Sequence, residues 1–511
     1  MTLYLHTHGP NPTPQNRSLV TPIVRTLPLN RLTPAGVFRR SRWKGQGFFL
    51  DGSMGGWFDG DYSLIGGAPF GSFRSKGKFS RFDYRLQNKE QNWSHQDKPI
   101  ACLQSWLTRF QMTQDCALAK ADIPFLHGGL VGFFSYELAH QFEKLPRPSE
   151  ALHDVPDINL LFLNFFIVID HRKDTLHIVY NPIPEIRMGR DEKEVRRDGL
   201  EKIDALEKRL SENAPPESDF VSAPLFKLTS DCSEETYIKR VRQAKYSIAK
   251  GDIFQANLSH RFSTPSNLQS LFEIYQGLCK VNPSPFAAYL EMGEIQIASG
   301  SPERLVRVKN NAKGTIVETR PIAGTKPRGK DADEDEQLIQ SLYGSEKERA
   351  EHLMLVDLER NDLGKICEYG SVRVDAMMAL ERYSHVSHLV SNIQGKLRPG
   401  LSPLQVLQAV FPGGTITGTP KIRCMEIISE LEQRARGIYT GAIGYIGFDG
   451  EMDLNIAIRT GVQSRGELSF QVGAGIVADS DPALEYQETL HKAAAFIEVL
   501  KSVNETHSAR S

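Results

Sequence analysis

The part of this sequence that most limits its possible folds is a strand followed by a helix near the C-terminus. Residues 473–482, Gly-Ala-Gly-Ile-Val-Ala-Asp-Ser-Asp-Pro, predict a buried strand with a glycine step and then a turn. Pro482 favours a helix that begins there, and Ser480 or Asp481 is placed to cap its first turn. The sequence therefore predicts a strand, a turn and a capped helix in immediate succession.

Two pairs of carboxylates stand at helical spacing. Glu485 and Glu488 lie three residues apart in the C-terminal helix, so both project from one face, and Lys492 follows on the same stripe. Far upstream, Glu348 and Glu351 open a second helical run that continues through residue 358. Two such helices could converge on one hard divalent cation, and Mg2+ fits best because it prefers oxygen ligands and keeps waters that a substrate can replace. The alternative is a pair of ordinary solvated helix faces.

Length and charge narrow the class of protein. The chain has 511 residues, 40% of them hydrophobic, and a formal net charge of -1; its length predicts about two to four domains. No stretch approaches the roughly 18 uninterrupted apolar residues of a membrane span, and a near-neutral charge gives no reason to expect nucleic acid. The six cysteines are scattered without Cys-x-x-Cys spacing, which is typical of reduced thiols. We expect a cytoplasmic protein with no membrane and no nucleic-acid partner.

The first part of the chain predicts a large sheet with few helices. Residues 1–35, rich in Pro, Thr and Asn, predict a loose N-terminal arm, and residues 36–185 form a first region with strands at 48–53, 62–66 and 128–136. Residues 160–170 are one dense apolar run, long enough for a single buried strand, and residues 175–180 predict its hairpin partner.

A charged segment separates this region from a second one. Residues 186–232 predict a surface helix followed by a linker rich in Pro and Ser, residues 233–497 form the second region, and residues 498–511 a tail. Ser233 predicts the N-cap of an amphipathic helix that runs to Lys250. Strands are predicted at 253–262, 441–448, 454–461 and 468–472, with a meander at 286–291, 295–299 and 305–308. The fold class is α+β, with large, mostly antiparallel β-sheets packed with helices.

Polar residues of the second region stand at positions suited to chemistry. Glu303 follows a strand and a glycine, although a structural turn alone explains such a carboxylate. Residues 321–325, Pro-Ile-Ala-Gly-Thr, predict a small-residue turn that lets a ligand approach backbone amides. His388 lies in an apolar segment, where a satisfied core histidine is the more common role.

Further downstream, two features suit a carboxylate ligand. Residues 411–421 offer amides and hydroxyls ahead of a helix, an arrangement that either binds a carboxylate or merely connects two elements. Arg459 is a cation embedded in a predicted strand; if buried it must be paired, and a fork aimed at a ligand carboxylate is a natural use. Tyr439 could add a hydroxyl. A divalent cation, an arginine, glycine amides and one histidine are together suited to a small polycarboxylate.

These motifs resemble the magnesium-dependent enzymes that use chorismate. The similarity spans residues 235–495 and is carried by Ser-Pro-Glu at 301–303, Arg-Pro-Ile-Ala-Gly-Thr at 320–325, Ile-Ala-Ile-Arg-Thr at 456–460, and the segments 351–362, 388–391 and 473–477. Residues 45–180 more weakly resemble the N-terminal region of the amidotransferase-coupled members, anthranilate synthase component I and aminodeoxychorismate synthase component I. The resemblance implies an anthranilate synthase component I-like fold.

The resemblance also implies roles for the candidate residues. Mg2+ is expected to bind Glu351 and Glu488 directly, with Glu348 and Glu485 supporting through waters, and to hold the ring carboxylate of chorismate. The other carboxylate is expected to bind Arg459, Tyr439 and the amides of Gly473 and Gly475, while Gly324, Thr325 and Thr415 line the ring. Lys492 would balance the acidic cluster, and Glu303 and His388 would serve proton transfer.

Three motifs resemble the branch of the family that makes 4-amino-4-deoxychorismate, on the route to p-aminobenzoate and folate. They are Asn-Leu-Ser at 257–259, Pro-Gly-Gly-Thr-Ile-Thr-Gly at 412–418 and Asp-Leu-Asn-Ile-Ala at 453–457. Ala323 points the other way, because that branch often has a lysine there as a nucleophile; without it, ammonia or water must add without covalent catalysis. The alternatives are the formation of anthranilate with release of pyruvate and, more remotely, a non-catalytic chorismate-binding regulatory subunit.

Two further expectations concern regulation and partners. The tryptophan-sensing Leu-Leu-Glu-Ser pattern of the family is present only as Leu50-Asp-Gly-Ser53, so we expect feedback by tryptophan to be weak or absent. The sequence contains no Gly-x-Cys-x-Gly elbow, which would carry a glutaminase nucleophile. The resemblance therefore implies that a separate glutamine amidotransferase subunit delivers the ammonia.

Overall fold

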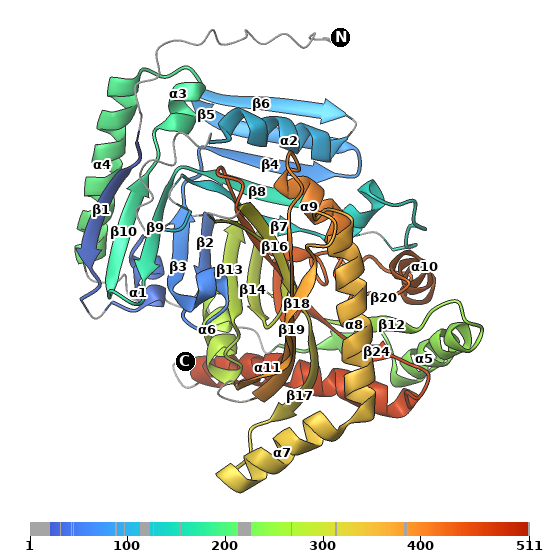
Figure 1. Cartoon of the computed structure of the whole chain (residues 1–511). Helices are drawn as coiled ribbons and strands as arrows, with labels where there is room; N and C mark the ends of the chain where they lie inside the picture. The colour runs from blue at the N-terminus through green and yellow to red at the C-terminus, as the bar shows by residue number, and fades with distance from the viewer. Residues whose placement is uncertain are drawn as a thin grey trace.

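Two antiparallel sheets, each with 12 strands, form the body of this protein in a computed structural model. The structure describes residues 21–508 except 31, 42, 44, 87–88, 97, 113–122, 126, 151, 153–154, 213–225, 267, 312–313 and 383–385. The two sheets pack face to face, and helices cover their outer faces (Figure 1). The predicted α+β class with large antiparallel sheets is confirmed.

The first sheet, sheet A, combines strands from both ends of the chain. Its order is β1 (Ile23–Pro28), β10 (Thr175–Tyr180), β9 (Phe165–Asp170), β3 (Tyr62–Gly67), β2 (Gln46–Asp51), β13 (Phe286–Met292), β14 (Ile295–Ser301), β23 (Thr460–Ser464), β24 (Glu467–Ile476), β12 (Gln255–Pro265) and β11 (Thr229–Ser230), with β20 (Gly418–Thr419) beside β12.

Sheet B is built in the same way. Its order is β17 (Ile322–Pro327), β19 (Val386–Lys396), β16 (Gly314–Arg320), β15 (Arg304–Asn311), β22 (Met452–Ile456), β21 (Ala442–Gly447), β7 (Gly129–Phe134), β8 (Ile158–Leu163), β4 (Gly71–Lys76), β5 (Phe79–Leu86) and β6 (Lys89–Gln96), with β18 (Arg373–Arg382) beside β19.

The two regions predicted from the sequence share both sheets. In sheet A, β2 of the first region pairs with β13 of the second, and in sheet B, β7 pairs with β21. The division at residues 186–232 therefore does not separate two independent sheets. Of this segment, α4 (Glu192–Ser211) is the predicted charged surface helix, and residues 213–225 of the predicted linker lie outside the described residues.

The inner layer between the sheets explains why several strands are apolar on both faces. In β2, Phe48 and Leu50 point into the layer between the sheets, where they join Phe133 of β7. The intervening Phe49 points to the opposite face, where α1 (Pro34–Ser41), α4, α6 (Phe272–Val281) and α11 (Pro482–Ser508) cover sheet A. Burying each such side chain contributes about 1.5–3 kcal/mol to the free energy of unfolding.

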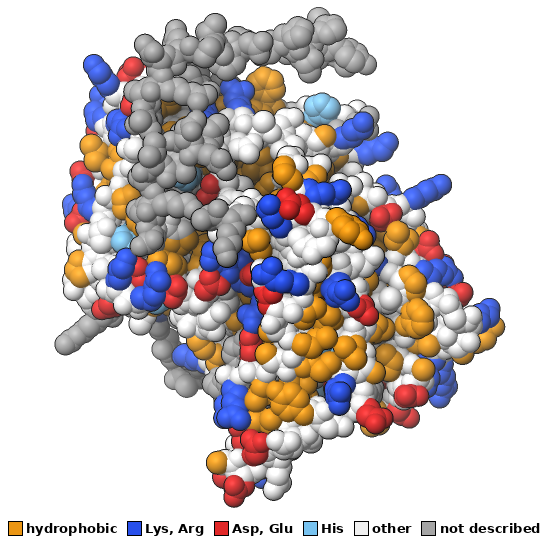
Figure 2. All heavy atoms as spheres, in the orientation of Figure 1, with side chains coloured by type: hydrophobic (Ala, Val, Ile, Leu, Met, Phe, Trp, Pro, Cys, Tyr) orange, Lys and Arg blue, Asp and Glu red, His pale blue; other side chains and the backbone are white. Residues whose placement is uncertain are grey.

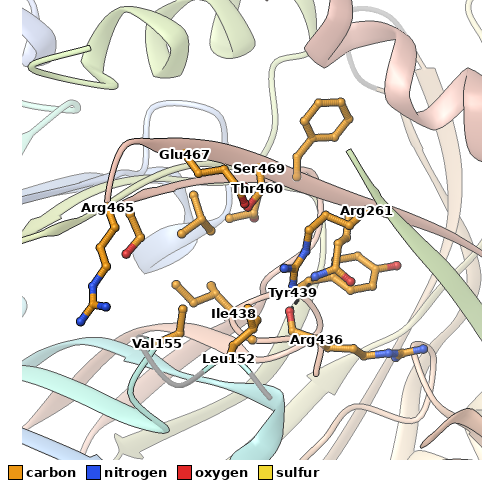
Figure 3. A pocket seen from close by; sticks show the side chains of 15 residues that line it. Leu152, Val155, Arg261, Arg436, Ile438, Tyr439, Thr460, Arg465, Glu467 and Ser469 are labelled. Atoms are coloured by element: carbon orange, nitrogen blue, oxygen red, sulfur yellow. Dashed lines mark hydrogen bonds between the residues drawn. The ribbon is translucent and has the colours of Figure 1, made fainter. Parts of the chain in front are cut away.

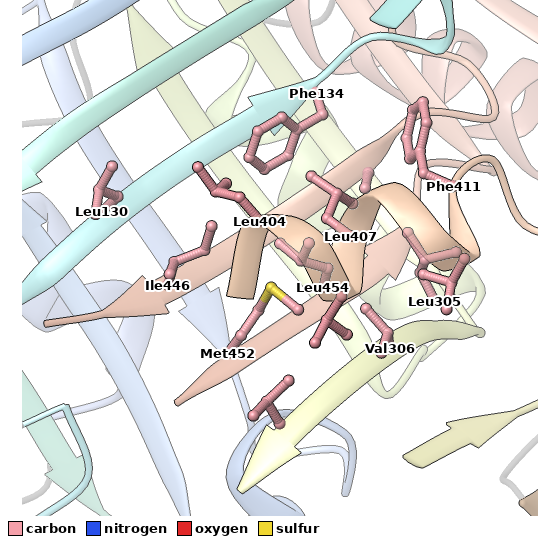
Figure 4. Packing of buried hydrophobic residues seen from close by; sticks show 14 of the residues in the cluster. Leu130, Phe134, Leu305, Val306, Leu404, Leu407, Phe411, Ile446, Met452 and Leu454 are labelled. Atoms are coloured by element: carbon pink, nitrogen blue, oxygen red, sulfur yellow. The ribbon is translucent and has the colours of Figure 1, made fainter. Parts of the chain in front are cut away.

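The outer face of sheet B is covered by α2 (Pro99–Phe110), α9 (Pro403–Val410) and part of α8 (Glu346–Gly364). In α9, Leu404 and Leu407 point down onto the sheet, against Ile446 of β21 and Leu454 of β22 (Figure 4). Ser402 and Gln405 form a reciprocal capping box at the start of this helix. The packing holds the loop that follows α9, residues 411–417, next to the centre of the sheet.

Both predicted terminal segments are more ordered than expected. Within the segment predicted to be a loose arm, residues 23–28 form β1 against β10, because Ile23 and Leu27 lie against the helices on sheet A. At the other end, α11 continues through the predicted tail to Ser508, because Val499 and Leu500 prolong its buried stripe. Residues 1–20 and 509–511 lie outside the described residues.

Three predicted strand assignments are wrong for one reason: the chain passes from one sheet to the other within the segment that was assigned to a single strand or meander. The run 160–170 breaks at Asn164 into β8 of sheet B and β9 of sheet A. The run 454–461 breaks at residues 457–459 into β22 of sheet B and β23 of sheet A. The predicted meander ends after β14, because β15 lies in sheet B. Asn164 donates to the carbonyl of Asn181 and to Glu185, which satisfies its buried amide.

The predicted helix starts are confirmed. The Ser233 hydroxyl accepts from the amide of Thr236 at the start of α5 (Glu234–Ala249). Asp481 caps α11 by accepting from two amides of its first turn, and Ser480 instead accepts from the amide of Val477 in the preceding turn. These caps fix where α11 begins relative to the glycine step of β24.

One face of the molecule carries exposed hydrophobic side chains. Leu353 of α8, Met377 of β18 and Tyr343 of α7 (Ala332–Gly344) are all more than a third exposed. Figure 2 shows hydrophobic side chains gathered on the face over these elements. Within the part of the chain that the structure describes, no helix is long and apolar enough to cross a membrane.

Candidate active site

The candidate site lies where the chain crosses twice between the sheets. One crossing, at residues 302–303, joins β14 to β15, and the other, at 457–459, joins β22 to β23. The amide of Gly300 donates to the carbonyl of Arg459 at 3.0 Å, and the amide of Ile456 donates to the carbonyl of Glu303 at 3.0 Å. These bonds place the side chains of Glu303 and Arg459 at one point between the sheets.

Glu303 is a buried acid. Burial raises the pKa of its carboxyl to about 7, although the Thr415 hydroxyl, the backbone at Ile322 and the charge of Arg459 all oppose the rise. By distance and angle, neither the Thr415 hydroxyl nor Oε1 of Glu303 has a hydrogen-bond partner among the described residues. Near neutral pH this carboxyl can therefore hold a proton and give it to a ligand.

Arg459 does not lie inside a strand, as was predicted, but in the break between β22 and β23. Its φ of 50° belongs to the left-handed region, which ends β22 and turns the chain toward sheet A. The side chain is partly exposed, while burial of its guanidinium lowers the pKa and Glu303 raises it. Arg459 makes no side-chain hydrogen bond or ion pair with any residue that the structure describes. An arginine in this state is a binding site for an anion.

His388 lies on β19 and faces the same point. Burial and, to a smaller extent, the charge of Arg459 lower the pKa of its imidazole to about 4, although Glu381 and the backbone of Gly324 oppose the change. The ring is therefore neutral at physiological pH and can accept a proton. His388 pairs in register with Thr325 of β17, whose side chain lies outside the described part of the structure.

Residues 322–325 of the predicted turn instead form the start of β17, which pairs with β19. The pairing is irregular between Ile322 and Thr325, and Gly324 in this bulge has a φ of 83°. A Cβ atom on Gly324 would lie 2.8 Å from Leu342 and 3.2 Å from Oε2 of Glu348. Glycine is therefore required there, and it brings β17 against the first turn of α8.

The glycine step of β24 forms the opposite wall. A Cβ atom on Gly473 would lie 2.7 Å from the Tyr439 hydroxyl and 2.8 Å from Oδ1 of Asn257. Burial raises the pKa of Tyr439, so its hydroxyl remains a hydrogen-bond donor at all physiological pH values. The predicted carboxylate-binding group of Tyr439, Gly473 and Gly475 is thus brought together at one end of β24.

The two acidic helices reach this same end of β24. On α11, Nζ of Lys492 contacts Glu488 at 2.8 Å and donates to the carbonyl of Gly473 at 2.9 Å. On α8, Oε1 of Glu351 accepts from Nε2 of Gln255 at 2.9 Å and lies 3.6 Å from where a Cβ atom of Gly475 would be. Glu351 and Glu488 therefore approach β24 from two different helices.

The carboxylate oxygens of these residues are the type of ligand that Mg2+ prefers, so the residues are chemically suited to this ion. Gln255 donates one hydrogen bond to Glu351, and Lys492 forms an ion pair with Glu488. Glu485 is buried one turn before Glu488, near Tyr237. Among the described residues, no three His, Cys, Asp or Glu side chains stand close enough together to hold a metal ion. The magnesium ligands stay a prediction.

Several buried polar atoms around the site lack partners, and three of them belong to residues that sequence reasoning did not assign to it. Besides Glu303 and Thr415, the unpartnered atoms are Oε1 of Gln255, Oδ1 of Asn257 and Oε2 of Glu359. Buried polar atoms are nearly always hydrogen-bonded in folded proteins, so such a group indicates a place for a polar ligand. Glu359 follows Glu351 by eight residues on the same stripe of α8, a spacing that could have identified it.

Glu359 and Lys421 form a polar layer behind Glu303. Burial raises the pKa of Glu359, and the neighbouring Glu303 and Asp362 also raise it, while Lys421 opposes the rise. Lys421, at the start of α10 (Lys421–Glu432), donates to the carbonyl of Val410 at 2.8 Å and pairs with Asp362 at 2.5 Å. This layer fixes the loop 411–417, which carries Thr415, against α8.

Comparison with known protein families shows a match over most of the chain. The family described as chorismate binding enzyme matches residues 72–498. Aminodeoxychorismate synthase component 1 of Bacillus subtilis (strain 168) is 40% identical over 453 residues, which cover 88% of this chain and 92% of that protein. Anthranilate synthase component 1 of Acetivibrio thermocellus is 36% identical over 495 residues, which cover 95% of this chain and 96% of that protein.

Solved structures show the same fold. Anthranilate synthase component I from Streptococcus pneumoniae TIGR4 superposes with a TM-score of 0.72 at 32% sequence identity, covering 85% of this chain and 92% of that one. The predicted anthranilate synthase component I-like fold is thereby confirmed.

Proposed function

The chain belongs to the family of chorismate-binding enzymes, and we propose that within it this protein converts chorismate and ammonia to 4-amino-4-deoxychorismate and water. The observation that carries the proposal is the guanidinium of Arg459, which has no ion pair among the described residues and lies near a neutral histidine, His388, and an acid of raised pKa, Glu303. An anionic substrate bound by Arg459 lies within reach of one group that can give a proton and one that can accept it.

The enolpyruvyl carboxylate is assigned to Arg459 and Tyr439. A bidentate contact from the guanidinium and a hydroxyl hydrogen bond would satisfy one carboxylate, with the amides of Gly473 and Gly475 beside it. Gly324 and Thr415 are assigned to the ring, since both lie on segments next to Glu303 and His388. The ligand would in this way occupy the space bordered by the unpartnered atoms of Gln255 and Asn257.

Proton transfer is assigned to Glu303 and His388. Ammonia forms the new C–N bond at the ring carbon that carries the hydroxyl, and the hydroxyl leaves as water after it takes a proton from Glu303. The proton lost by the added ammonia returns to the site through His388, and Glu303 is reprotonated. Ala323 supplies no amine, so the chain offers no covalent intermediate at that position.

Mg2+ is assigned to Glu351 and Glu488, with Glu348 and Glu485 behind them. Bound there, the ion would neutralise the ring carboxylate and draw electron density from the ring, which helps the hydroxyl leave. Lys492 is assigned a balancing role, because it holds Glu488 in place beside Gly473.

Anthranilate formation is the second candidate. It is supported by 36% identity to an anthranilate synthase component 1 over nearly the whole chain and by Ala323, which is not the lysine frequent in the other branch. We favour the aminodeoxychorismate product because one of the three motifs that resemble that branch contributes directly to the site. Asn257 of this motif lies beside Gly473.

The identity of the product distinguishes the formation of 4-amino-4-deoxychorismate from the formation of anthranilate. The protein is incubated with chorismate, Mg2+ and excess ammonium at mildly alkaline pH, and the product is analysed by mass and by fluorescence. We expect an amino-chorismate that keeps its enolpyruvyl group and gives p-aminobenzoate only after a lyase is added. Fluorescent anthranilate together with pyruvate would contradict the assignment, and bound chorismate without turnover would favour a regulatory subunit. A sample treated with a chelator, then resupplied with Mg2+, tests the metal.

Glutamine in place of ammonium tests the ammonia source. We propose that a separate glutamine amidotransferase subunit delivers ammonia to this chain in the cytoplasm, since the sequence lacks a glutaminase elbow. The protein should therefore turn over chorismate with ammonium but not with glutamine alone. Turnover with glutamine by the purified chain would contradict this proposal.

Tryptophan should leave the initial rate unchanged up to millimolar concentrations. In the segment that corresponds to the tryptophan-sensing pattern, the carboxylate of Asp51 already accepts from the amide of Ser53 at 3.0 Å, from Ser63 at 3.2 Å and from Tyr275 at 3.3 Å. Three of the roughly four lone-pair sites of that carboxylate are then already used within the protein, so it has little capacity left for an amino-acid ligand. Initial rates measured over a tryptophan titration check this, and strong inhibition would contradict both this prediction and the choice of product.

A further inference from the structure

A cavity of about 270 Å3 lies behind the candidate active site, with no role in the reaction proposed above. It is bordered by β23 and β24 of sheet A, by residues 436–439 before β21, and by the loop around Leu152 and Val155 (Figure 3). Its volume is close to the lower end of the roughly 300–1,000 Å3 that is typical of small-molecule sites. A ligand with a single six-membered ring fits a space of this size.

Arg261 of β12 is the buried cation of this cavity. Its side chain is only 7% exposed, and its Nη2 donates to the carbonyl of Ala435 at 3.1 Å. Its Nε and Nη1 donate to no residue that the structure describes, and Arg261 forms no ion pair there. Two acids that act on the charge of Arg261 are Asp231 and Glu467. Asp231 accepts from the backbone amide of Arg261 and pairs with Arg434 at 3.2 Å. Glu467 lies on the cavity wall and forms no ion pair with Arg261.

The other cations of the cavity wall are not available in the same way. Arg436 is fully occupied: it pairs with Glu432 at 2.7 Å and donates to the carbonyls of Ile416 and Asn257. Arg465 lies at the rim with its side chain 63% exposed. Arg261 is therefore the group of the cavity that an anion would satisfy, because a buried arginine with open donors is costly unless a ligand pairs with it.

Much of the remaining wall is apolar or aromatic, and polar groups along β23 and β24 come from Thr460, Ser464, Glu467, Ser469 and Gln471. Leu152, Val155 and Ile438 line one side of the cavity (Figure 3). Val462 of β23 and Phe470 of β24 also line it. Tyr439 closes the end near Arg261 with its ring. A ligand that satisfies both parts of this wall has one carboxylate and one compact apolar body.

We propose that this cavity binds a small aromatic monocarboxylate, with its carboxylate on Arg261 and its ring between the aliphatic side chains of the loop and those of β23 and β24. The polar side chains Gln471 and Ser469 lie along the same wall. Nε2 of Gln471 is fixed by the carbonyl of Arg436 at 2.7 Å, so this side chain is held in place before a ligand arrives. The inference does not depend on which reaction the chain catalyses.

The cavity and the candidate active site share a wall. Tyr439 lines the cavity with its ring and approaches Gly473 with its hydroxyl, and Thr460 of the cavity directly follows Arg459. A ligand in the cavity therefore contacts the residue that we assign to a substrate carboxylate.

Benzoate is the simplest probe, and its binding is measured by calorimetry on the full chain without substrate. Arg261→Met should weaken benzoate binding by about 10- to 100-fold, because it removes a charge-assisted hydrogen-bond donor pair. Leu152→Trp fills the cavity from a loop and should weaken binding to a similar degree while leaving Arg261 intact. Arg465→Met, the same substitution at the rim, should change the affinity by less than about threefold.

Arg459→Met separates this cavity from the active site, which also contains a cation for carboxylates. Benzoate binding that is retained in Arg459→Met and lost in both Arg261→Met and Leu152→Trp supports the proposal. Binding that is lost in Arg459→Met but unchanged in the two cavity variants overturns it, as does the absence of any benzoate binding to the unmodified chain. If Arg261→Met fails to fold, Leu152→Trp against Arg459→Met gives the same decision.

Discussion

Glu303→Gln should lower kcat by about 10²- to 10⁴-fold, the range expected when a general acid is lost. The glutamine keeps the volume of the side chain but has no proton to give to the leaving hydroxyl. Because burial raises the pKa of Glu303 to about 7, the unmodified enzyme should also lose kcat/KM as pH rises through this value, at a fixed concentration of free ammonia. The variant should lack that descending limb.

Calorimetry with chorismate provides the control for this prediction. The Glu303→Gln variant should bind chorismate with an affinity close to that of the unmodified protein, since the carboxylate contacts are assigned to other residues. The same pKa shift, from 4.5 to about 7, also favours folding at low pH, and this contribution is lost as pH rises through 7. An unchanged kcat together with an unchanged descending limb would exclude Glu303 as the acid.

Arg459→Met should lower kcat/KM for chorismate roughly 30- to 5,000-fold, because a ligand carboxylate loses its charged partner. This corresponds to a loss of about 2–5 kcal/mol of transition-state stabilisation. The same variant should not lower the melting temperature. Since Arg459 forms no ion pair or side-chain hydrogen bond with the described residues, methionine removes a cation that the fold does not use. Steady-state kinetics and thermal unfolding of one preparation measure both effects.

Arg304→Met is the matched control, because it should lower stability, whereas Arg459→Met should lower only activity. Arg304 is a buried arginine one residue from Glu303, but it pairs with Asp453 at 2.9 Å and with Glu318 at 3.0 Å. Its loss leaves a buried carboxylate uncompensated and should lower the free energy of unfolding by about 3–5 kcal/mol. If Arg459→Met lowered the melting temperature as much as Arg304→Met, Arg459 would be a structural residue and its assignment to the substrate would fail.

The sequence predicts local structure well wherever one residue type has a single physical use. Ser233 and Asp481 cap helices as expected, because few other positions suit a side-chain oxygen that accepts from free amides. Apolar runs are more ambiguous. In a structure whose strands are buried on both faces, Asn164 alone marks the passage from β8 to β9, and nothing in the hydrophobic pattern distinguishes one long strand from two strands in different sheets.

The site itself is only partly predictable from spacing. The sequence identified Glu303, His388 and Arg459 singly, but their meeting depends on two crossings between the sheets that have no sequence signature. Gln255 and Glu359 were missed, since the first lies at the start of an ordinary strand and the second on a helix already rich in charge. The spacing of the two carboxylate pairs allowed either two solvated helix faces or two helices that converge on one site. The magnesium ion expected there stays a prediction.

The sharing of both sheets by distant parts of the chain has a consequence for synthesis. All six residues of β7 are buried, yet one edge of this strand has no partner until residues 442–447 of β21 have been made. In the same way, one edge of β2 has no partner until β13 has been made. On the ribosome, the first half of the chain must therefore carry unpaired apolar strand edges for most of the translation time, a state that favours aggregation and engagement by chaperones. A truncated translation product would therefore be prone to aggregation and could not complete either sheet. The two halves of the chain have to fold together.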